Sequence, residues 1–208
     1  MSASAAYSPV RWRLVVATLC ALGLIVFLRK HQPSYEEKIA PLPVTGTIGV
    51  ATKARNFEVK VKRLKMARAY RVDGRYSDDP SQVVRADGIW LSALLEATAT
   101  REPGFVSAQL RTRDGRLYAS SGGDRPKLEG VNLAGTSLAT GITASGAYFF
   151  DVPEARLEGA TLQFYWGLGA PGGLDHLLDI DLQLDAQTLS RLRDQAVPEL
   201  DMRMRTDR

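Results

Sequence analysis

The chain has 208 residues, of which 45% are hydrophobic and 24% are charged, and its formal net charge is +4 at pH 7. This composition suits one globular domain with attachments, and it excludes a chain disordered throughout, a collagen and a disulfide-rich miniprotein. The only cysteine, Cys20, excludes an intramolecular disulfide, so the fold depends on packing.

An apolar run near the N-terminus predicts a membrane anchor. Residues 14–28 carry no charge, and they follow a short N-terminal segment of residues 1–13. A helix of this length rises about 22 Å, which is less than the roughly 30 Å hydrocarbon core, but flanking arginines can snorkel. The alternative is a cleaved signal peptide. Because no small-residue cleavage pattern follows the run, we favour a single transmembrane helix. The flanking basic residues nearly balance, so they do not determine its orientation.

The next segment, residues 29–45, contains three prolines and mixed charges without periodicity, which is typical of a tether. Beyond it, residues 46–197 show the pattern of strands. Residues 57–61 alternate strictly between apolar and charged side chains, and the slip at residues 62–64 indicates a β-bulge.

Further turn signals divide the rest of this region into short strands. Asp87-Gly88 predicts a turn, followed by a strand at 89–99 that is apolar on both faces. Asp114-Gly115 predicts the turn of a hairpin between residues 105–112 and 116–120. Short strands of this kind predict an antiparallel β-sandwich. Three more strands are expected at 144–152, 161–166 and 176–184, and loops at 73–81 and 121–141.

The chain is expected to end with a short helix and a flexible tail. Residues 186–196 have an N-cap residue in Asp185, and Leu184 and Leu189 are placed to form a hydrophobic staple. Pro198 ends the pattern, and the tail of residues 198–208 has few apolar anchors.

Several of these segments together resemble a known family. The chain is similar to the immunoglobulin-like β-sandwich of a secreted immunoprotective antigen of mycobacteria and its membrane-anchored actinobacterial relatives of unknown function. The resemblance covers roughly residues 46–166. It implies an immunoglobulin-like all-β domain outside the cytoplasm, with no catalytic activity and no cofactor. The residues that carry it are Phe57-x-Val59-x-Val61-x-x-Leu64, Asp87-Gly88-Ile89-Trp90, Leu110-Arg111-Thr112-x-Asp114-Gly115-x-x-Tyr118, and Gly141 leading to Tyr148-Phe149-Phe150-Asp151-Val152-Pro153.

The strongest candidate for a metal site is a set of three carboxylates. On a strand, Asp175, Asp179 and Asp181 share one face, so they could bind calcium if a loop added carbonyl oxygens. The competing interpretation, which we favour, is that they form the solvent-facing half of an amphipathic strand, since no calcium-loop spacing is present. His176 points to the other face and is the only histidine in the domain, which leaves little for nucleophilic catalysis.

Charge is distributed unevenly along the domain. Eight basic residues and one acidic residue lie between Lys53 and Arg71, whereas eleven acidic and six basic residues follow from Asp151 onward. A basic strand of this kind could contact anionic lipid headgroups or an envelope partner. The alternative is a solvated outer face. Nucleic acid is not expected, because stacking aromatic residues are not interleaved. The candidate interaction surface consists of Lys60, Lys62, Arg63, Lys65 and Arg68.

The sequence therefore predicts a single-pass membrane protein with an extracytoplasmic immunoglobulin-like domain. We expect a non-catalytic binding or accessory module of the bacterial cell envelope rather than an enzyme. One alternative is a calcium-dependent envelope binder or enzyme that uses Asp175, Asp179 and Asp181. Another is an adaptor that faces the cytoplasm and contacts nucleic acid.

Overall fold

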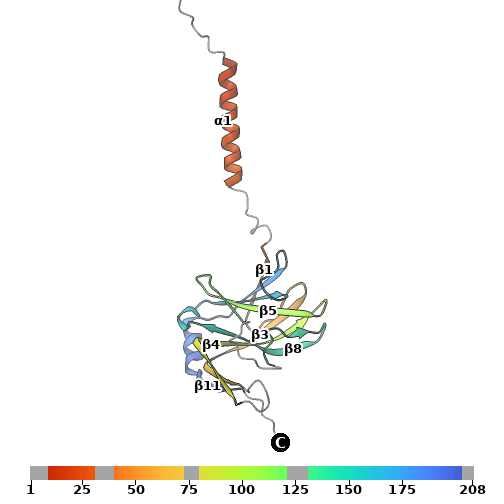
Figure 1. The fold of residues 1–208 in the computed structure, drawn as a ribbon, viewed down its shortest axis with the longest axis vertical. Helices are drawn as coiled ribbons and strands as arrows, with labels where there is room; N and C mark the ends of the chain where they lie inside the picture. Colours follow the sequence, from red (N-terminus) through yellow and green to blue (C-terminus); the bar gives the residue numbers. More distant parts are fainter. Residues whose placement is uncertain (1–8, 31–39, 73–79, 121–130, 203–208) are drawn as a thin grey trace, which may run out of the picture. The chain divides into compact units, whose positions relative to one another are not determined.

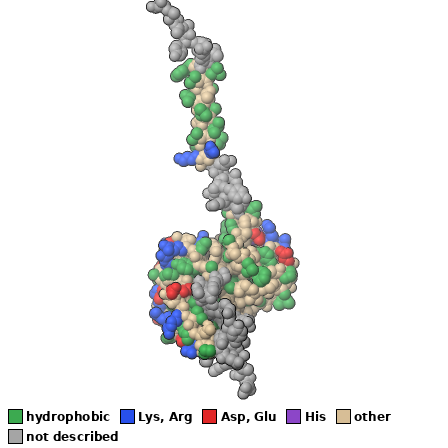
Figure 2. All heavy atoms as spheres, in the orientation of Figure 1, with side chains coloured by type: hydrophobic (Ala, Val, Ile, Leu, Met, Phe, Trp, Pro, Cys, Tyr) green, Lys and Arg blue, Asp and Glu red, His purple; other side chains and the backbone are tan. Residues whose placement is uncertain are grey.

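The computed structural model describes residues 9–30, 40–72, 80–120 and 131–202. The chain divides into two compact units, Met1–Ala40 and Pro41–Arg208. The first contains the helix α1 (Pro9–Lys30; Figure 1). Its apolar side chains are exposed along the helix (Figure 2). Its segment Trp12–Lys30 has a mean hydropathy of 1.9 and is long and apolar enough to cross a membrane, a property that signal sequences share. The helix extends beyond the predicted run of residues 14–28 at both ends.

The second unit is a sandwich of two β-sheets (Figure 1). We name the first sheet A; its strand order is β1-β10-β9-β5-β6, with β7 paired to β5. Sheet B has the order β11-β3-β4-β8, with β2 paired to β3. Sheet A comprises β1 (Leu42–Thr47), β5 (Gly104–Arg111), β6 (Leu117–Ala119), β7 (Ser137–Leu138), β9 (Thr161–Trp166) and β10 (His176–Asp181); sheet B comprises β2 (Thr52–Lys53), β3 (Phe57–Val72), β4 (Gln82–Ala99), β8 (Thr143–Val152) and β11 (Val197–Asp201).

Each sheet has one parallel edge strand that the sequence did not predict. β1 pairs parallel with β10, so Leu42–Thr45 of the predicted tether belong to sheet A. β11 pairs parallel with β3, so Pro198–Asp201 are a strand instead of part of a flexible tail. Both strands are short and lack alternation, and no residue of either strand is fully buried. Residues 203–208 lie outside the described residues.

The sheets enclose a continuous apolar core, and sheet B carries a second cluster on its outer face. Ile89, Leu91 and Ala93 of β4 are buried in the core between the sheets, whereas Trp90 is buried in the outer cluster. In that cluster the ring centroids of Tyr70 and Phe149 lie 5.2 Å apart in an edge-to-face arrangement. The prediction that residues 89–99 are apolar on both faces is therefore confirmed for residues 89–94, whereas the outward positions beyond them are Glu96 and Thr98.

Two irregularities interrupt the pairing of β3 with β4. The first lies between Val61 and Arg63, where the sequence predicts a bulge. The second separates Ala67 and Ala69 and faces residues 86–89. The predicted turn at Asp87-Gly88 falls in this second bulge and is wrong, because β4 continues through it.

Two short helical segments complete the described domain: the 3₁₀ turn η1 (Glu154–Arg156) follows β8, and α3 (Ala186–Asp194) follows β10. The Asp185 side chain accepts a hydrogen bond of 2.7 Å from the backbone N–H of Thr188, and Leu184 and Leu189 are both buried. The strand expected at 176–184 ends earlier, at Asp181, and Gln183 adopts a left-handed φ of 52°. Of the predicted loops, residues 73–79 and 121–130 lie outside the described residues.

Candidate interaction surface

The basic residues of β3 are exposed, and a bulge decides which way they face. Lys60 pairs with Glu96, and beyond the bulge Arg63 pairs with Leu94 and Lys65 with Ser92. Leu94 and Ser92 face away from the core, Leu94 against the outer apolar cluster and Ser92 bonded to its Tyr70. Without the extra residue, strict alternation would turn Arg63 and Lys65 toward the other sheet. The bulge therefore collects four basic side chains on the outer face of sheet B, which we name the β3 stripe: Lys60, Lys62, Arg63 and Lys65.

Ion pairing leaves most of this charge available. Lys62 bonds Glu96 on the neighbouring strand. Lys60, Arg63 and Lys65 form no ion pair within the described ranges of the chain. The positive charges of these side chains are not neutralised by a neighbouring carboxylate, so the stripe is suited to contact an anionic partner.

Arg68, the fifth predicted residue, is set apart from the stripe by the second bulge. It lines a small cleft of about 290 Å³ with Ile89 of β4 and Pro198 of β11. An ion pair of 2.5 Å between Arg193 and Glu154 borders the same cleft. The structure thus joins four of the five predicted residues and separates the fifth.

The three aspartates of the calcium hypothesis each have a different partner. Asp175 Oδ1 accepts from the backbone N–H of His176 at 2.8 Å, and Asp181 Oδ1 accepts from that of Gln183 at 2.8 Å. Asp179 Oδ2 accepts from Arg111 Nη2 at 2.7 Å. Across the described part of the chain, no group of three or more His, Cys, Asp or Glu side chains is placed to hold a metal ion.

Asp179 instead belongs to a polar row across the outer face of sheet A, which sequence reasoning missed. Gln109 Nε2 of β5 donates to Gln163 Oε1 of β9 at 2.8 Å, and Arg111 reaches over β9 to Asp179 on β10. The buried atoms Asp179 Oδ1 and Thr161 Oγ1 have no hydrogen-bond partner among the described residues. The alternation of residues 176–184 predicted the outward face of β10, but nothing in it indicates that β5 lies two strands away.

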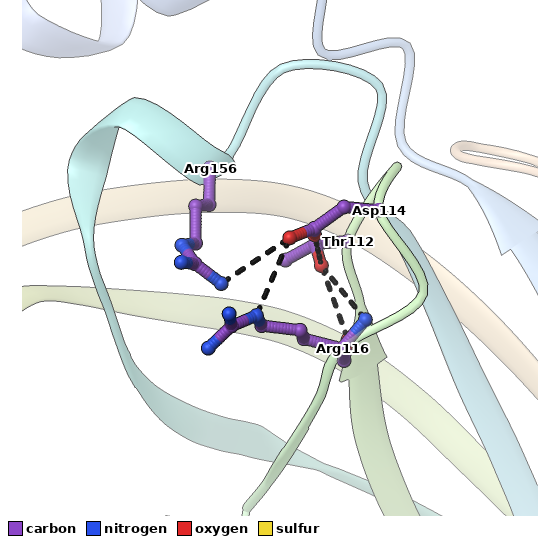
Figure 3. Close-up of polar contacts among 4 residues, drawn as sticks. All are labelled: Thr112, Asp114, Arg116 and Arg156. Carbon is purple, nitrogen blue, oxygen red and sulfur yellow. Dashed lines mark hydrogen bonds and ion pairs between the residues drawn. The ribbon is translucent and has the colours of Figure 1, made fainter.

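The hairpin between β5 and β6 is held by a compact polar cluster (Figure 3). Thr112 Oγ1 donates to Asp114 and accepts from the backbone N–H of Arg116 at 3.1 Å. Asp114 Oδ2 lies 3.3 Å from Arg156 Nη1 of η1 and 3.4 Å from Arg116 Nε. The Thr112 hydrogen bond, assisted by the two guanidinium groups, lowers the pKa of Asp114 below its ordinary value of 3.8. Every member is engaged within the cluster, so it stabilises the turn.

An open cleft of about 670 Å³ lies at the start of α3. Its lining carries both signs of charge, with Arg113 and Arg191 facing Glu158, Asp181 and Asp185. This mixture favours no single class of ligand. The remaining candidate for chemistry, His176, has its Nδ1 buried without a hydrogen-bond partner among the described residues.

Comparison with known proteins finds solved structures that are similar at low sequence identity. No protein-family model matches it, and no curated protein matches it. An uncharacterised β-sandwich protein of Clostridium difficile shares 11% identity over 71% of this chain and 99% of its own, with a TM-score of 0.39. The YjhA protein of Bacillus subtilis shares 15% identity over 65% of this chain and 99% of its own, with a TM-score of 0.44. The secreted protein MPT63 of Mycobacterium tuberculosis shares 18% identity over 66% of this chain and 98% of its own, with a TM-score of 0.39.

Proposed function

We propose that this protein is a membrane-anchored, immunoglobulin-like module of the bacterial cell envelope that binds an anionic partner without catalysis. In this proposal α1 stays in the membrane and the β-sandwich lies outside the cytoplasm. The observation that carries the binding role is the bulge between Val61 and Arg63, which turns Arg63 and Lys65 to the same face as Lys60.

The β3 stripe lies where protection of a strand edge is the simpler role, but its three basic side chains without an ion pair among the described residues support binding. Lysines that block an unwanted strand partner lie along an edge strand. β3 pairs with β2 only as far as Val59 and with β11 only from Ala67, so along the stripe its one strand partner is β4, and the stripe projects from the face of the sheet. Pairing with β4 fixes the backbone of β3, so the basic side chains project from it in one row. A row of positive charges suits a polyanion such as an acidic envelope polymer.

Two further observations support the location. Segment Trp12–Lys30 has the length and hydropathy of a membrane span. The motifs quoted above resemble an exported family, which supports a domain outside the cytoplasm. An uncleaved helix rather than a signal peptide is supported by the absence of small residues in the stretch Leu28-Arg29-Lys30-His31-Gln32-Pro33.

Binding is tested with the full chain in detergent micelles and fluorescent long-chain polyphosphate as the polyanion probe. The stripe variant carries Lys60→Gln, Arg63→Gln and Lys65→Gln. Its control removes the same charge from exposed arginines elsewhere, by Arg85→Gln, Arg113→Gln and Arg191→Gln.

We expect the stripe variant to bind about 10- to 100-fold more weakly, with a shallower dependence on salt, because each basic residue near an anionic surface contributes about 1 kcal/mol. The control variant is expected to change affinity less than about threefold, since its arginines lie outside the proposed surface. Equal losses in both variants would show that only net charge matters, and the proposed surface would be wrong.

A further inference from the structure

We infer that one end of the β-sandwich contacts the lipid headgroup region through exposed aliphatic side chains, an inference that rests on the anchoring role proposed for α1. This end is the one at which β1 begins. We name it the leucine end, and it is defined by Leu42, Ile142, Leu168 and Leu174.

Strand pairing places the three leucines together. Leu42 opens β1 beside the start of β10, and its backbone N–H donates to Asp175 O at 2.8 Å. β9 runs antiparallel to β10 and ends at Trp166, so the loop of residues 167–175 joins the two strands at this same end. Leu168 and Leu174 are the two leucines of that loop.

Ile142 lies at the same end of the other sheet. It precedes β8, whose first residue, Thr143, pairs with Thr98 near the end of β4. Phe57 pairs with Ala99 at the end of the ladder between β3 and β4, and it stacks on Trp166 of sheet A with ring centroids 6.1 Å apart. The ends of both sheets therefore meet where the 167–175 loop emerges.

These four side chains are all exposed. Leu42 is 46%, Ile142 64%, Leu168 61% and Leu174 55% accessible. Single exposed apolar residues are ordinary on a protein surface, but four at one end are half of those in the described part of the domain. Figure 2 shows hydrophobic side chains exposed where β1 begins. The full set is Leu42, Val50, Val83, Leu117, Ile142, Leu168, Leu174 and Val197.

The backbone of the loop supports a role for its leucines. Leu174 adopts a φ of 58°, in the left-handed region that a side chain with a Cβ disfavours. A leucine that is both exposed and strained contributes little to folding, so its contact with another surface is the simplest reason for its presence. The loop is also held in place, because Tyr165 Oη donates to Gly169 O at 2.6 Å and Ser107 Oγ donates to Gly167 O at 2.7 Å.

The chain length indicates the bilayer as the occupant. Only eleven residues separate Lys30, the last residue of α1, from Leu42. A fully extended chain of that length spans at most about 40 Å, so the start of β1 stays near the membrane that holds α1. An apolar end constrained to this distance meets the headgroup region repeatedly, at a high effective concentration.

Charge around the leucine end predicts how it binds. The exposed Arg55 and Arg101 are offset by Glu102 and Asp175, so the end has no net charge excess. Apolar contact rather than ion pairing would hold the domain there. Docking is therefore expected to persist at high salt, in contrast to binding at the β3 stripe.

The test labels single cysteines with an environment-sensitive fluorophore in the full chain, with Cys20→Ala as the background, reconstituted in phosphatidylcholine–phosphatidylglycerol vesicles. The labelled variants are Leu168→Cys and Leu174→Cys. The matched control is Leu117→Cys, which is 56% accessible but pairs with Arg111 at the opposite end of β5. All three positions are exposed, so labelling leaves the core intact.

We expect blue-shifted emission and quenching by nitroxide lipids at residues 168 and 174, unchanged in high salt, and neither effect at residue 117. If residues 168 and 174 match residue 117 while the chain remains in the vesicles, anchoring stands and the inference is wrong. A blue shift without lipid quenching that grows with protein density would assign the leucine end to a second copy and overturn the inference. Loss of the chain from the vesicles would overturn the anchoring proposal and the inference with it.

Discussion

The carboxylate of Asp151 on β8 accepts a hydrogen bond of 3.0 Å from the backbone N–H of Gly88 in the bulge of β4. Its second oxygen accepts from the N–H of Asp87 at 2.9 Å. One side chain therefore satisfies two donors that the bulge removes from the ladder with β3. This contact explains why an Asp-Gly pair, a strong turn signal, lies inside a continuous strand.

Replacing Asp151 by Asn is expected to destabilise the domain by about 1–3 kcal/mol, because hydrogen bonds to a charged acceptor are strong and the amide offers only one oxygen. Urea unfolding followed by tryptophan fluorescence measures this change. The control, Glu158→Gln, alters an exposed carboxylate without a hydrogen bond among the described residues, and we expect less than about 0.5 kcal/mol. Equal stability of the two variants would contradict a structural role for Asp151.

Gly88 is expected to tolerate no larger side chain. A Cβ at this position would lie 2.4 Å from the carbonyl oxygen of Val152, so the backbone must shift. Gly88→Ala should cost about 1–3 kcal/mol. Gly172→Ala is the matched control, since a Cβ there meets nothing within 4 Å. Thermal unfolding of both variants compares them, and a Gly88→Ala protein as stable as Gly172→Ala would refute the close approach.

A buried tyrosine links the two sheets and predicts an alkaline limit to stability. Tyr148 Oη on β8 donates to Val106 O on β5 at 2.5 Å. Burial raises the pKa of Tyr148 above its ordinary value of 10.0. Because this pKa is raised in the folded state, the stabilisation by protonated Tyr148 is complete below about pH 10 and is lost as the pH rises above that value. Tyr148→Phe should cost about 1 kcal/mol at neutral pH, and its stability should fall less steeply above pH 10. Urea titrations across that range measure both effects, and identical alkaline slopes would contradict the assignment.

The N-cap of α3 predicts an acid limit. Hydrogen bonds from Thr188 lower the pKa of Asp185 below 3.8. Because this pKa is lowered in the folded state, the stabilisation by ionised Asp185 is complete above the ordinary pKa of 3.8. It is lost as the pH falls from that value through the pKa of the folded state. Asp185→Asn keeps a side chain that caps well but does not titrate, so stability should fall less between about pH 5 and pH 2 than in the parent. A parent-like acid slope for Asp185→Asn would contradict the cap.

Local signals predicted the elements that local forces specify. The slip at residues 62–64 predicted the first bulge, because a change of alternation is visible in the sequence itself. The capping pattern at Asp185 likewise places the start of α3. In contrast, the second bulge depends on Asp151, more than sixty residues along the chain, so Asp87-Gly88 was interpreted as a turn.

The edge strands and the leucine end show what the sequence could not indicate. β1 and β11 follow no alternation, and their partners β10 and β3 are far away in the chain. The four residues of the leucine end come from three separate segments, which only the strand order brings to one end. The β3 stripe was predictable in composition, but the exclusion of Arg68 from it follows from the second bulge.

The most direct test of the proposed function is the topology of the intact chain. A reporter that is active only outside the cytoplasm is fused after Arg208, a cytoplasm-active reporter is fused in parallel, and the mass of the membrane-bound protein is measured. We predict activity of the external reporter and a mass that retains α1. Activity of the cytoplasmic reporter, or a released protein that lacks residues 9–30, would contradict a membrane-anchored envelope module.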